Sequence, residues 1–249
     1  MVRPLVAGNW KMNGLSGSLK EVRAVVKALA NHPVKCDVMI CPPATLLQSM
    51  KEAAKGSKLR LGGQDCHASS QGAHTGDLSP EMLKNGGASA VIVGHSERRQ
   101  DHGESNMDVR AKGAGAHRAG LAAIICIGET LSQREKGQAL RAVGHQLKGS
   151  LPATANARNT VIAYEPVWAI GSGLTPSADD VAKLHGHLRK TLSKLLPEGE
   201  ARRMRILYGG SVKPQNALEL LTIENVNGAL VGGASLKAAD FKEVFGIYR

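Results

Sequence analysis

Aromatic side chains are scarce in this sequence, and this argues against one large class of partners. There are two Phe, two Trp and three Tyr among 249 residues, which leaves few rings for nucleic-acid bases to stack on. The formal net charge is +11. The basic residues are scattered, however, and the densest clusters are pairs such as Arg98-Arg99, whereas a nucleic-acid tail shows like charges in blocks. We therefore expect basic helix surfaces and a site that attracts an anion, and not nucleic acid as the main partner.

Cysteine is also sparse, and its spacing fits neither a zinc site nor a disulfide framework. The four residues are Cys36, Cys41, Cys66 and Cys126, with no C-x-x-C pair. Cys36 and Cys41 bracket an extended stretch of about five residues at roughly 3.3 Å each, so they lie on the order of 16 Å apart, beyond disulfide reach. We expect reduced thiols and a cytoplasmic location.

Long apolar runs and metal-ligand motifs are missing as well. The apolar run within residues 1–10 is too short for a signal peptide, and no stretch approaches about 18 apolar residues, so we expect a soluble protein without a membrane partner. The pair His185 and His187 lies on a predicted helix, where positions i and i+2 point to different faces. We therefore expect no metal, no organic cofactor, and catalysis by acid–base groups alone.

What the sequence does contain is a repeated alternation of short apolar runs with longer segments of helical periodicity. The eight runs are Leu5 to Ala7, Val38 to Cys41, Leu59 to Gly62, Ala90 to Val93, Ala122 to Ile127, Val161 to Tyr164, Ile206 to Tyr208 and Ala229 to Val231. Runs this short and continuously apolar fit strands that are buried on both faces, as in a parallel sheet covered by helices.

The segments between these runs predict the helices. They are Ser16 to Ala30, Ala44 to Lys55, Pro80 to Asn85, Asn106 to Ala119, Leu131 to Leu151, Ser177 to Leu196, Pro214 to Leu221 and Ala238 to Phe245. Several begin with Ser or Asn, or carry Pro near the first turn, as helix starts do. Glycines inside them cost up to about 1 kcal/mol each relative to Ala and weaken the prediction there; they include Gly113, Gly115, Gly144 and Gly186.

Eight strand–helix pairs in one chain, with no linker-like change of composition, favour a closed barrel over an open, doubly wound sheet. We predict an α/β fold, a (β/α)8 barrel, with residues 1–249 as a single domain. The residues that follow the strands of such a barrel converge on one face, where active sites are built. The chemically competent residues at these positions are Asn9, Lys11, Gln64, His95, Glu97, Glu165, Ser211, Gly232 and Gly233.

Two glycine turns predict an anion site. Gly209-Gly210-Ser211 and Gly232-Gly233-Ala234-Ser235 each link a strand to a helix start, so that unpaired backbone N–H groups and the positive end of a helix dipole can face an anion. Either turn alone reads as a tight connection. Both together, after the seventh and eighth strands, match the phosphate site that is common in these barrels.

Glu165 is the first acid–base candidate, because it directly follows the sixth strand and precedes Pro166, which prevents immediate helix continuation. The alternative is a solvated loop glutamate. The next segment, Val167-Trp168-Ala169-Ile170-Gly171-Ser172-Gly173, is too apolar for an ordinary exposed loop, however. It resembles a lid that closes over substrate and excludes water.

His95 and Lys11 are the other candidates. His95 lies at the junction of the fourth strand and a short helical turn, where a histidine is as often structural as functional. A helix N-terminus disfavours the imidazolium, however, and leaves a neutral ring that can donate a hydrogen bond to a carbonyl. Lys11, beside Asn9, brings a positive charge that can offset a phosphate and a developing oxyanion, although alone it reads as a surface lysine.

These residues stand in blocks that resemble the triosephosphate isomerase family, in family order and over nearly the whole chain. The blocks are Gly8-Asn9-Trp10-Lys11-Met12-Asn13, Gly94-His95-Ser96-Glu97-Arg98-Arg99, Ala163-Tyr164-Glu165-Pro166-Val167-Trp168-Ala169-Ile170-Gly171, Tyr208-Gly209-Gly210-Ser211-Val212 and Val231-Gly232-Gly233-Ala234-Ser235-Leu236. The resemblance implies a TIM barrel that interconverts dihydroxyacetone phosphate and D-glyceraldehyde 3-phosphate through an enediolate, in glycolysis and gluconeogenesis.

The resemblance also implies a role for each residue. Glu165 would move the proton between the two substrate carbons, and His95 would polarise the carbonyl. Lys11 and Asn9 would steady the charge, with Glu97 as the supporting carboxylate near Lys11. Gly171, Ser211, Gly232 and Gly233 would bind the substrate phosphate through backbone groups.

The segment from Asp65 to Ser79 is long for a connection inside a compact domain, where medians are about 4 to 6 residues. By its composition it reads as a surface loop. In the family it resembles an arm that inserts into a partner subunit, with Thr75 near its tip reaching the neighbour's Asn9 and His95, so a homodimer is expected. Two departures from the family pattern are Leu174 at the lid exit, where many relatives carry Lys, and Asp77 in the arm, where Glu is common.

Two other functions compete with this interpretation. A different phosphate-handling barrel enzyme, such as a Schiff-base aldolase or a metal-dependent epimerase, needs an inner-strand Lys or metal ligands, and the sixth strand offers Glu165 instead. A phosphate-binding barrel protein without turnover is the alternative from another class, and an acid–base pair beside the phosphate turns would be superfluous for it.

Overall fold

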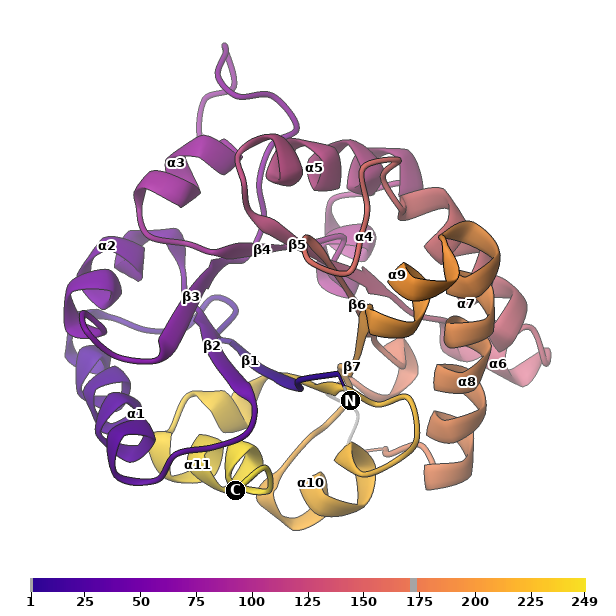
Figure 1. The fold of residues 1–249 in the computed structure, drawn as a ribbon. Helices are drawn as coiled ribbons and strands as arrows, with labels where there is room; N and C mark the ends of the chain where they lie inside the picture. Colours follow the sequence, from indigo (N-terminus) through magenta and orange to yellow (C-terminus); the bar gives the residue numbers. More distant parts are fainter. Residues whose placement is uncertain (1, 171–173) are drawn as a thin grey trace.

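The computed structural model describes residues 2–170 and 174–249 and shows a closed barrel of eight parallel strands ringed by helices (Figure 1). Each strand pairs with the next along the chain, and β1 pairs with β8 to close the barrel. The strands are β1 Leu5–Asn9, β2 Asp37–Cys41, β3 Leu59–Gly63, β4 Ala90–Val93, β5 Ala122–Ile127, β6 Thr160–Tyr164, β7 Arg205–Tyr208 and β8 Gly228–Val231. The predicted (β/α)8 barrel is thus confirmed, with β4 and β5 at the predicted bounds.

The α-helices cover the outside of the barrel. They are α1 Leu19–Asn31, α2 Ala44–Ala53, α3 Pro80–Asn85, α4 Ser96–Asp101, α5 Asn106–Arg118, α6 Leu131–Glu135, α7 Ala139–Ser150, α8 Ala178–Leu195, α9 Glu198–Arg203, α10 Pro214–Leu221 and α11 Ala238–Gly246. Three short 3-10 turns complete the assignment: η1 Ser16–Ser18, η2 Val167–Ala169 and η3 Gly233–Ser235.

The prediction of one helix from Leu131 to Leu151 was wrong. The segment forms two helices, α6 and α7, separated at Gly137, whose φ of 67° lies in the left-handed region that ends helices. Helix α9 was not predicted either, because Ala201 is the one apolar side chain among its six residues and no helical periodicity shows.

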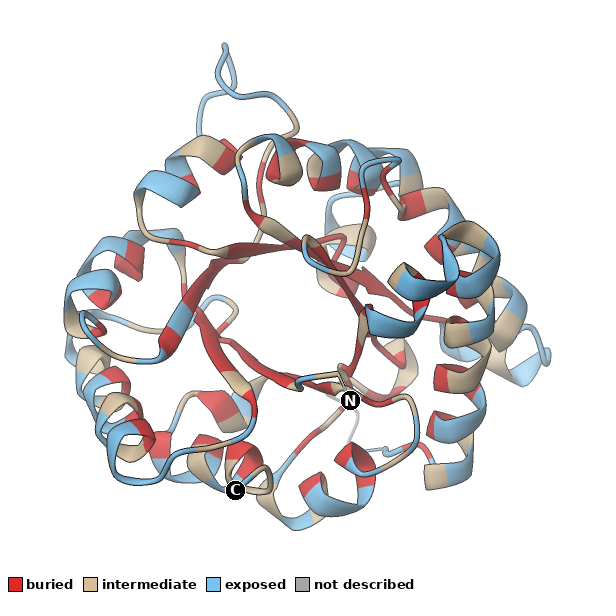
Figure 2. Cartoon of the chain, viewed as in Figure 1, coloured by how far each residue is buried: buried red, intermediate tan, exposed pale blue. Residues whose placement is uncertain are grey.

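The strands are buried on both faces, as their continuous apolar runs predict (Figure 2). Alternate side chains form two separate clusters. In β5, for example, Ile124 belongs to the cluster inside the barrel and Ile125 to the larger cluster between strands and helices. The inner cluster consists of Leu5, Ala7, Met39, Cys41, Ala90, Ile92, Ile124, Cys126, Val161, Ala163, Leu207 and Leu230.

The glycines in helix α5 have a packing reason. A Cβ at Gly115 would lie 2.7 Å from the carbonyl oxygen of Ala68, and one at Gly113 would lie 2.9 Å from Cγ of Pro152. The helix therefore approaches its neighbours more closely than any side chain at these positions would permit. At Gly186, in α8, no atom of the described residues lies within 4 Å of such a Cβ apart from the adjoining residues and backbone of its own helix, and nothing in the structure explains this glycine.

Two further features bear on the expectations from composition. All four cysteines are buried and free of disulfides. Across the described part of the chain, none of the helices combines the length and the apolar character needed to cross a membrane.

Candidate active site

The carboxyl ends of the strands surround a cavity of about 490 Å³. It brings together most of the side chains and turns that the sequence singled out. Its lining includes Asn9, Lys11, His95, Ser96, Glu97, Gln100, Glu165, Val167, Ile170, Gly209, Gly210, Ser211, Val212, Lys213, Leu230, Gly232, Gly233 and Ala234. Five different strands, β1, β4, β6, β7 and β8, therefore contribute to one site, as expected at this end of a barrel.

Glu165 and His95 face each other inside this cavity. The carboxylate Oε1 of Glu165 lies 2.8 Å from Nε2 of His95, and Oε2 accepts a 2.9 Å hydrogen bond from the backbone N–H of Ser96. Only 2% of Glu165 and 5% of His95 is exposed. A carboxylate and an imidazole that share such a buried position can both hold and move protons.

Two glycines leave the space that Glu165 occupies. Both are visible in the sequence, but a glycine after a strand does not by itself indicate this role. A Cβ at Gly128, after β5, would lie 1.7 Å from the carbonyl oxygen of Glu165. A Cβ at Gly209, after β7, would lie 3.0 Å from its Cγ. Substitution of either glycine would therefore displace Glu165.

The backbone of helix α4 determines which nitrogen of His95 carries a proton. His95 is the residue before α4, and its Nδ1 accepts a 3.3 Å hydrogen bond from the backbone N–H of Glu97. An acceptor nitrogen carries no proton, so Nε2 is the protonated nitrogen of the neutral ring and donates to Glu165. Helix α4 thus favours a neutral imidazole with its N–H directed into the cavity.

The pair also shifts the acidities of both groups. Burial raises the pKa of Glu165, but the facing His95, the Ser96 N–H and the charge of Lys11 outweigh it and hold this pKa below its ordinary value. Burial lowers the pKa of His95, and the neighbouring Glu165 carboxylate more than reverses this and raises it. Glu165 is therefore ionised and able to accept a proton at neutral pH.

Lys11 has an uncommon backbone conformation. Its φ of 52° lies in the left-handed region, and three hydrogen bonds surround it: its N–H donates to Oδ1 of Asn9 at 3.0 Å, Nε2 of Gln64 donates to its carbonyl at 2.8 Å, and its ammonium lies 2.5 Å from Oε1 of Glu97. Such a strained position is held where the surroundings fix it, and here they direct a positive charge into the cavity.

The two glycine turns contribute another part of the cavity wall, with Ser211, Gly232 and Gly233. Among the described residues, none accepts a hydrogen bond from the backbone N–H of Ser211 or Gly233. The 3-10 turn η3 begins at Gly233, so its positive end points toward the same space. These donors can bind an anion. Gly171 lies outside the described residues.

The segment after β6 closes one side of the cavity with Val167 and Ile170. Its first part forms the 3-10 turn η2, and the indole of Trp168 donates a 2.8 Å hydrogen bond to Oε1 of Glu129. The guanidinium of Arg134 lies 4.4 Å from the centre of the Trp168 ring. Of the predicted lid, Gly171, Ser172 and Gly173 lie outside the described residues.

Glu129 is a site-related residue that the sequence analysis missed. It is fully buried, and it also accepts a 3.1 Å hydrogen bond from the hydroxyl of Tyr164. Burial raises its pKa, and the hydrogen bond from Trp168 offsets only part of this rise. Its position after β5 is visible in the sequence and could have indicated a site residue. Its partners Tyr164 and Trp168, however, come close only in the folded chain.

The loop from Asp65 to Ser79 protrudes from the barrel between β3 and α3 (Figure 1). Thr75 and Asp77 are exposed on it, and neither lines the cavity that contains Glu165. A second cavity of about 560 Å³ lies at the base of the loop, with Gln64, Cys66, Leu83, Arg98 and Lys112 in its wall. It lacks the Glu165–His95 pair, so the smaller cavity is the candidate active site.

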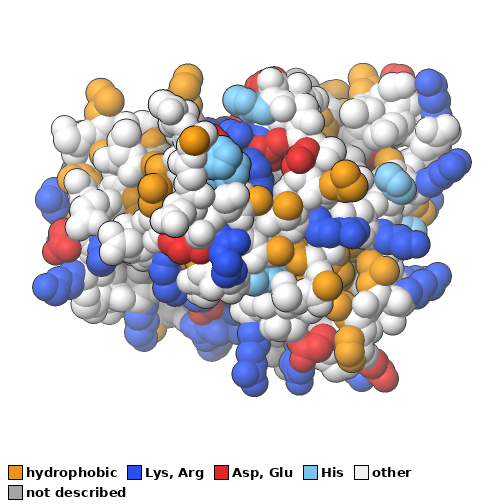
Figure 3. Space-filling model, turned by 90° about the horizontal axis from the view of Figure 1, so that it is seen from above, with side chains coloured by type: hydrophobic (Ala, Val, Ile, Leu, Met, Phe, Trp, Pro, Cys, Tyr) orange, Lys and Arg blue, Asp and Glu red, His pale blue; other side chains and the backbone are white. Residues whose placement is uncertain are grey.

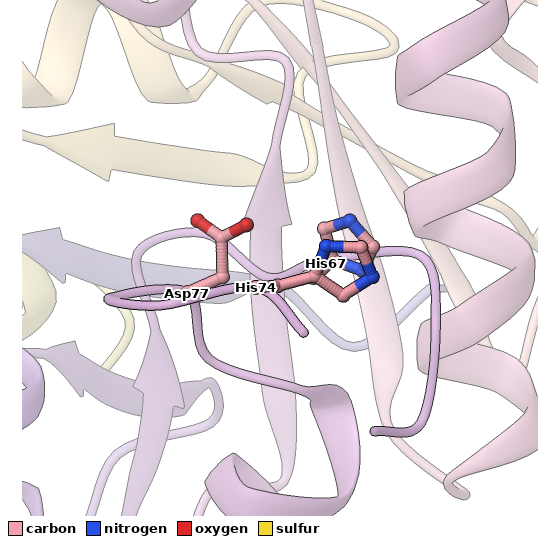
Figure 4. A group of neighbouring side chains, drawn as sticks. All are labelled: His67, His74 and Asp77. Atoms are coloured by element: carbon pink, nitrogen blue, oxygen red, sulfur yellow. The ribbon is translucent and has the colours of Figure 1, made fainter. Parts of the chain in front are cut away.

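His67, His74 and Asp77 on this loop place possible metal-ligand atoms within 4.8 Å of one another (Figure 4). The two imidazoles are stacked, however, with centroids 3.9 Å apart and planes inclined by 30°. A metal ion binds in the plane of each imidazole, and planes that are nearly parallel share no point within bonding distance of both rings. Nδ1 of His67 is also occupied by the N–H of Ser69. We therefore assign no metal to this cluster.

Comparisons with known proteins agree on one family. The family model described as triosephosphate isomerase matches residues 4–247. The chain is 57% identical over 240 residues to the triosephosphate isomerase of Bradyrhizobium diazoefficiens, covering 96% of this chain and 95% of that protein. It is 56% identical over 249 residues to that of Mesorhizobium japonicum, covering 100% and 97%. A crystal structure of triosephosphate isomerase from Bartonella henselae matches with a TM-score of 0.93 and 48% identity over all of both chains.

Proposed function

The chain belongs to the triosephosphate isomerase family, and from this membership we propose how its own residues divide the work. The enzyme interconverts dihydroxyacetone phosphate and D-glyceraldehyde 3-phosphate in glycolysis and gluconeogenesis, and its substrate is a triose phosphate. The reaction moves one proton between adjacent carbons by way of an enediolate. It therefore requires a base, an electrophile for the carbonyl oxygen and a grip on the phosphate.

Glu165 is the proposed base. The observation that carries this assignment is the buried, ionised carboxylate at the mouth of β6, within the same cavity as the glycine turns. A base must reach the substrate C–H directly, so the carboxylate has to leave Nε2 of His95 and the N–H of Ser96 when substrate enters. A buried carboxylate that gives up these hydrogen bonds becomes a stronger base, because the bonds are what lower its pKa.

His95 is the proposed electrophile. Its Nε2–H already points into the cavity, because Nδ1 is held as an acceptor by the N–H of Glu97. Once Glu165 has turned to the substrate, the largest contributions that raise the pKa of His95 are removed and only the smaller one of Glu97 is left, whereas burial and the N-terminus of α4 remain. The ring then stays neutral and donates to the carbonyl and enediolate oxygens.

Lys11, Asn9 and Glu97 are proposed to stabilise charge. The ammonium of Lys11 is a cation in the cavity wall, positioned by Glu97 at 2.5 Å and, through the backbone, by Asn9 and Gln64. A cation fixed before the reaction stabilises an oxyanion more than one that must reorganise. Glu97 touches Lys11, and its backbone N–H touches His95, so it acts as a positioning residue for both.

Ser211, Gly232 and Gly233 are proposed to hold the phosphate through backbone N–H groups, together with Gly171, whose place is not described. Val167, Trp168, Ala169, Ile170, Gly171, Ser172 and Gly173 are the proposed lid. What supports a lid is the apolar side chains of Val167 and Ile170 in the cavity wall, since closing an apolar cover excludes water.

We also propose a homodimer in which the loop from Asp65 to Ser79 is the contact arm. Two observations support this: the loop protrudes with Thr75 exposed, and a cavity of about 560 Å³ lies at its base, where an arm of a second copy could enter. In such a dimer Thr75 would reach the neighbour's Asn9 and His95. A cytoplasmic location and one domain over residues 1–249 complete the proposal.

A coupled assay of D-glyceraldehyde 3-phosphate isomerisation in the presence of EDTA tests this function. We expect full activity with the chelator, because the proposed chemistry needs only side chains and backbone groups. The alternative of a phosphate-binding barrel without turnover predicts a folded protein that binds inorganic phosphate and shows no isomerisation, and that result would overturn our proposal.

A further inference from the structure

The N-terminus lies at the opposite end of the barrel (Figure 1). This end contains a basin lined by arginines. It measures about 890 Å³. We call it the arginine basin, and its lining consists of Val2, Arg3, Arg60, Ala157, Arg158, Arg202, Arg203 and Arg205. In the view at right angles, Lys and Arg side chains project from the lower edge, which is this end of the barrel (Figure 3). The assigned chemistry lies at the other ends of the strands and uses none of these residues.

Part of the basin is a continuation of the barrel interior. Arg3 stands two residues before Leu5, and Arg205 two residues before Leu207, both of which point into the barrel. Because side chains alternate along a strand, these arginines point inward as well. Asp37 stands two residues before the inward Met39 and lies among them. The lowest layer of the barrel is therefore ionic, whereas the layers above it are apolar.

One carboxylate is shared by three guanidinium groups. Asp37 lies 2.8 Å from Nε of Arg3, 2.7 Å from Nη2 of Arg205 and 3.3 Å from Nη1 of Arg60. The remaining acidic partners are Glu198 and Glu200, which pair with Arg202 and Arg203. Six arginines thus face three carboxylates, and Arg158 has no ion pair among the described residues. The excess is three positive charges.

The basin is also preorganised. Nη2 of Arg3 donates to the carbonyl of Cys36 at 2.9 Å, and Nε of Arg205 donates to the carbonyl of Arg3 at 2.8 Å. Both guanidinium groups are therefore fixed before any ligand arrives. None of the described residues accepts a hydrogen bond from Nη1 of Arg3 or Nη1 of Arg205, so donors remain for an anion.

The composition of the wall limits the kind of anion. Guanidinium groups match phosphate oxygens with paired hydrogen bonds. The wall has no aromatic ring, so it offers no surface on which a nucleobase could stack. We propose that the arginine basin binds a compact oligophosphate, a chain of a few phosphate groups whose charge matches the excess of guanidinium. This proposal is independent of the catalytic assignments.

Equilibrium dialysis with tripolyphosphate tests the proposal at about 0.1 M salt, with triose phosphates at saturation so that the catalytic site is occupied. The test variant is R60Q/R158Q, which leaves Arg3 and Arg205 on Asp37. The control is R23Q/R141Q, which removes the same charge from exposed helix positions whose side chains make no hydrogen bond to the described residues. Circular dichroism and the isomerase assay verify that both variants are folded and active.

We expect about one tripolyphosphate per chain, a loss of affinity of at least about tenfold in R60Q/R158Q, and a change below about twofold in the control. ATP should bind within about threefold of tripolyphosphate, because the base finds no partner. Absence of saturable binding up to about 1 mM, equal losses in both variants, or competition by triose phosphate would overturn the proposal. The proposal would also be overturned if a 12-nucleotide single strand bound more tightly than tripolyphosphate and the test variant abolished this binding. That result would indicate a nucleic-acid surface.

Discussion

The indole Nε1 of Trp168 lies 2.8 Å from Oε1 of Glu129, so the turn after β6 is tied to the loop after β5. We predict a coupling of about 1–3 kcal/mol between Trp168→Phe and Glu129→Leu in a double-mutant cycle, because each substitution removes one partner of a buried hydrogen bond to a charged acceptor and such a bond has this value. Urea unfolding of the wild type, the two single variants and the double variant, all at the same protein concentration, measures this coupling. Additive effects of the two substitutions would mean that the contact contributes nothing to stability.

Glu165 controls the acidity of His95. In the unliganded enzyme the carboxylate raises the pKa of His95 above its ordinary value, so Glu165→Gln should bring it below that value, since burial then dominates. At a pH between the two values, His95 carries more positive charge in the wild type than in the variant. Nitrogen NMR of labelled His95 reads the protonation state. An equal or higher pKa in the variant would contradict the arrangement.

Much of the barrel could be predicted from the sequence because its signals are local. Helix α3 begins where Ser79 and Pro80 indicate, and the hydroxyl of Ser79 accepts a 3.2 Å hydrogen bond from Met82 N. Strand β5 is continuous and apolar, and it has the predicted bounds. The break at Gly137 was missed because the sequence does not distinguish a glycine that ends a helix from one that lies inside it. Gly137 follows the end of α6, whereas Gly144 lies inside α7.

The candidate site likewise has one part that could be predicted from the sequence and one part that could not. Residues directly after strands, such as Glu165 and His95, could be found from position alone. Glu129 follows β5 in the same way, but its role could not be predicted, because its hydrogen bonds join segments 35 and 39 residues apart and the sequence does not reveal that its carboxylate is buried. The arginine basin could not be predicted from the sequence for a similar reason. Arg3, Arg60 and Arg205 are far apart in the sequence and come together only when the barrel closes.

Replacement of His95 should separate carbonyl activation from phosphate binding. We predict that His95→Gln lowers kcat by at least about tenfold and leaves the inhibition constant of inorganic phosphate nearly unchanged, because the imidazole is proposed to act on the carbonyl oxygen and the glycine turns on the phosphate. Steady-state kinetics with phosphate as inhibitor gives both numbers. If phosphate inhibition weakens as much as kcat falls, the division of roles is wrong.

The arm can be tested by a charge at its tip. Thr75→Arg should yield monomers with much reduced activity, because a guanidinium in a contact built for a hydroxyl is not readily desolvated. Sedimentation velocity and the isomerase assay on the same sample measure the two effects. The control is Ser132→Arg, which adds the same charge at an exposed position of α6, outside the arm, and should remain dimeric and active. A fully active Thr75→Arg monomer would remove any role of the arm in catalysis.

The central claim is that Glu165 moves the proton, and the kcat of Glu165→Asp tests it most directly. The substitution keeps the carboxylate but withdraws it by about one methylene, and proton transfer is sensitive to displacements of about 1 Å. The variant should fold normally, bind inorganic phosphate as the wild type does, and lose roughly a hundredfold in kcat. A loss below about threefold in a properly folded protein would show that another group is the base.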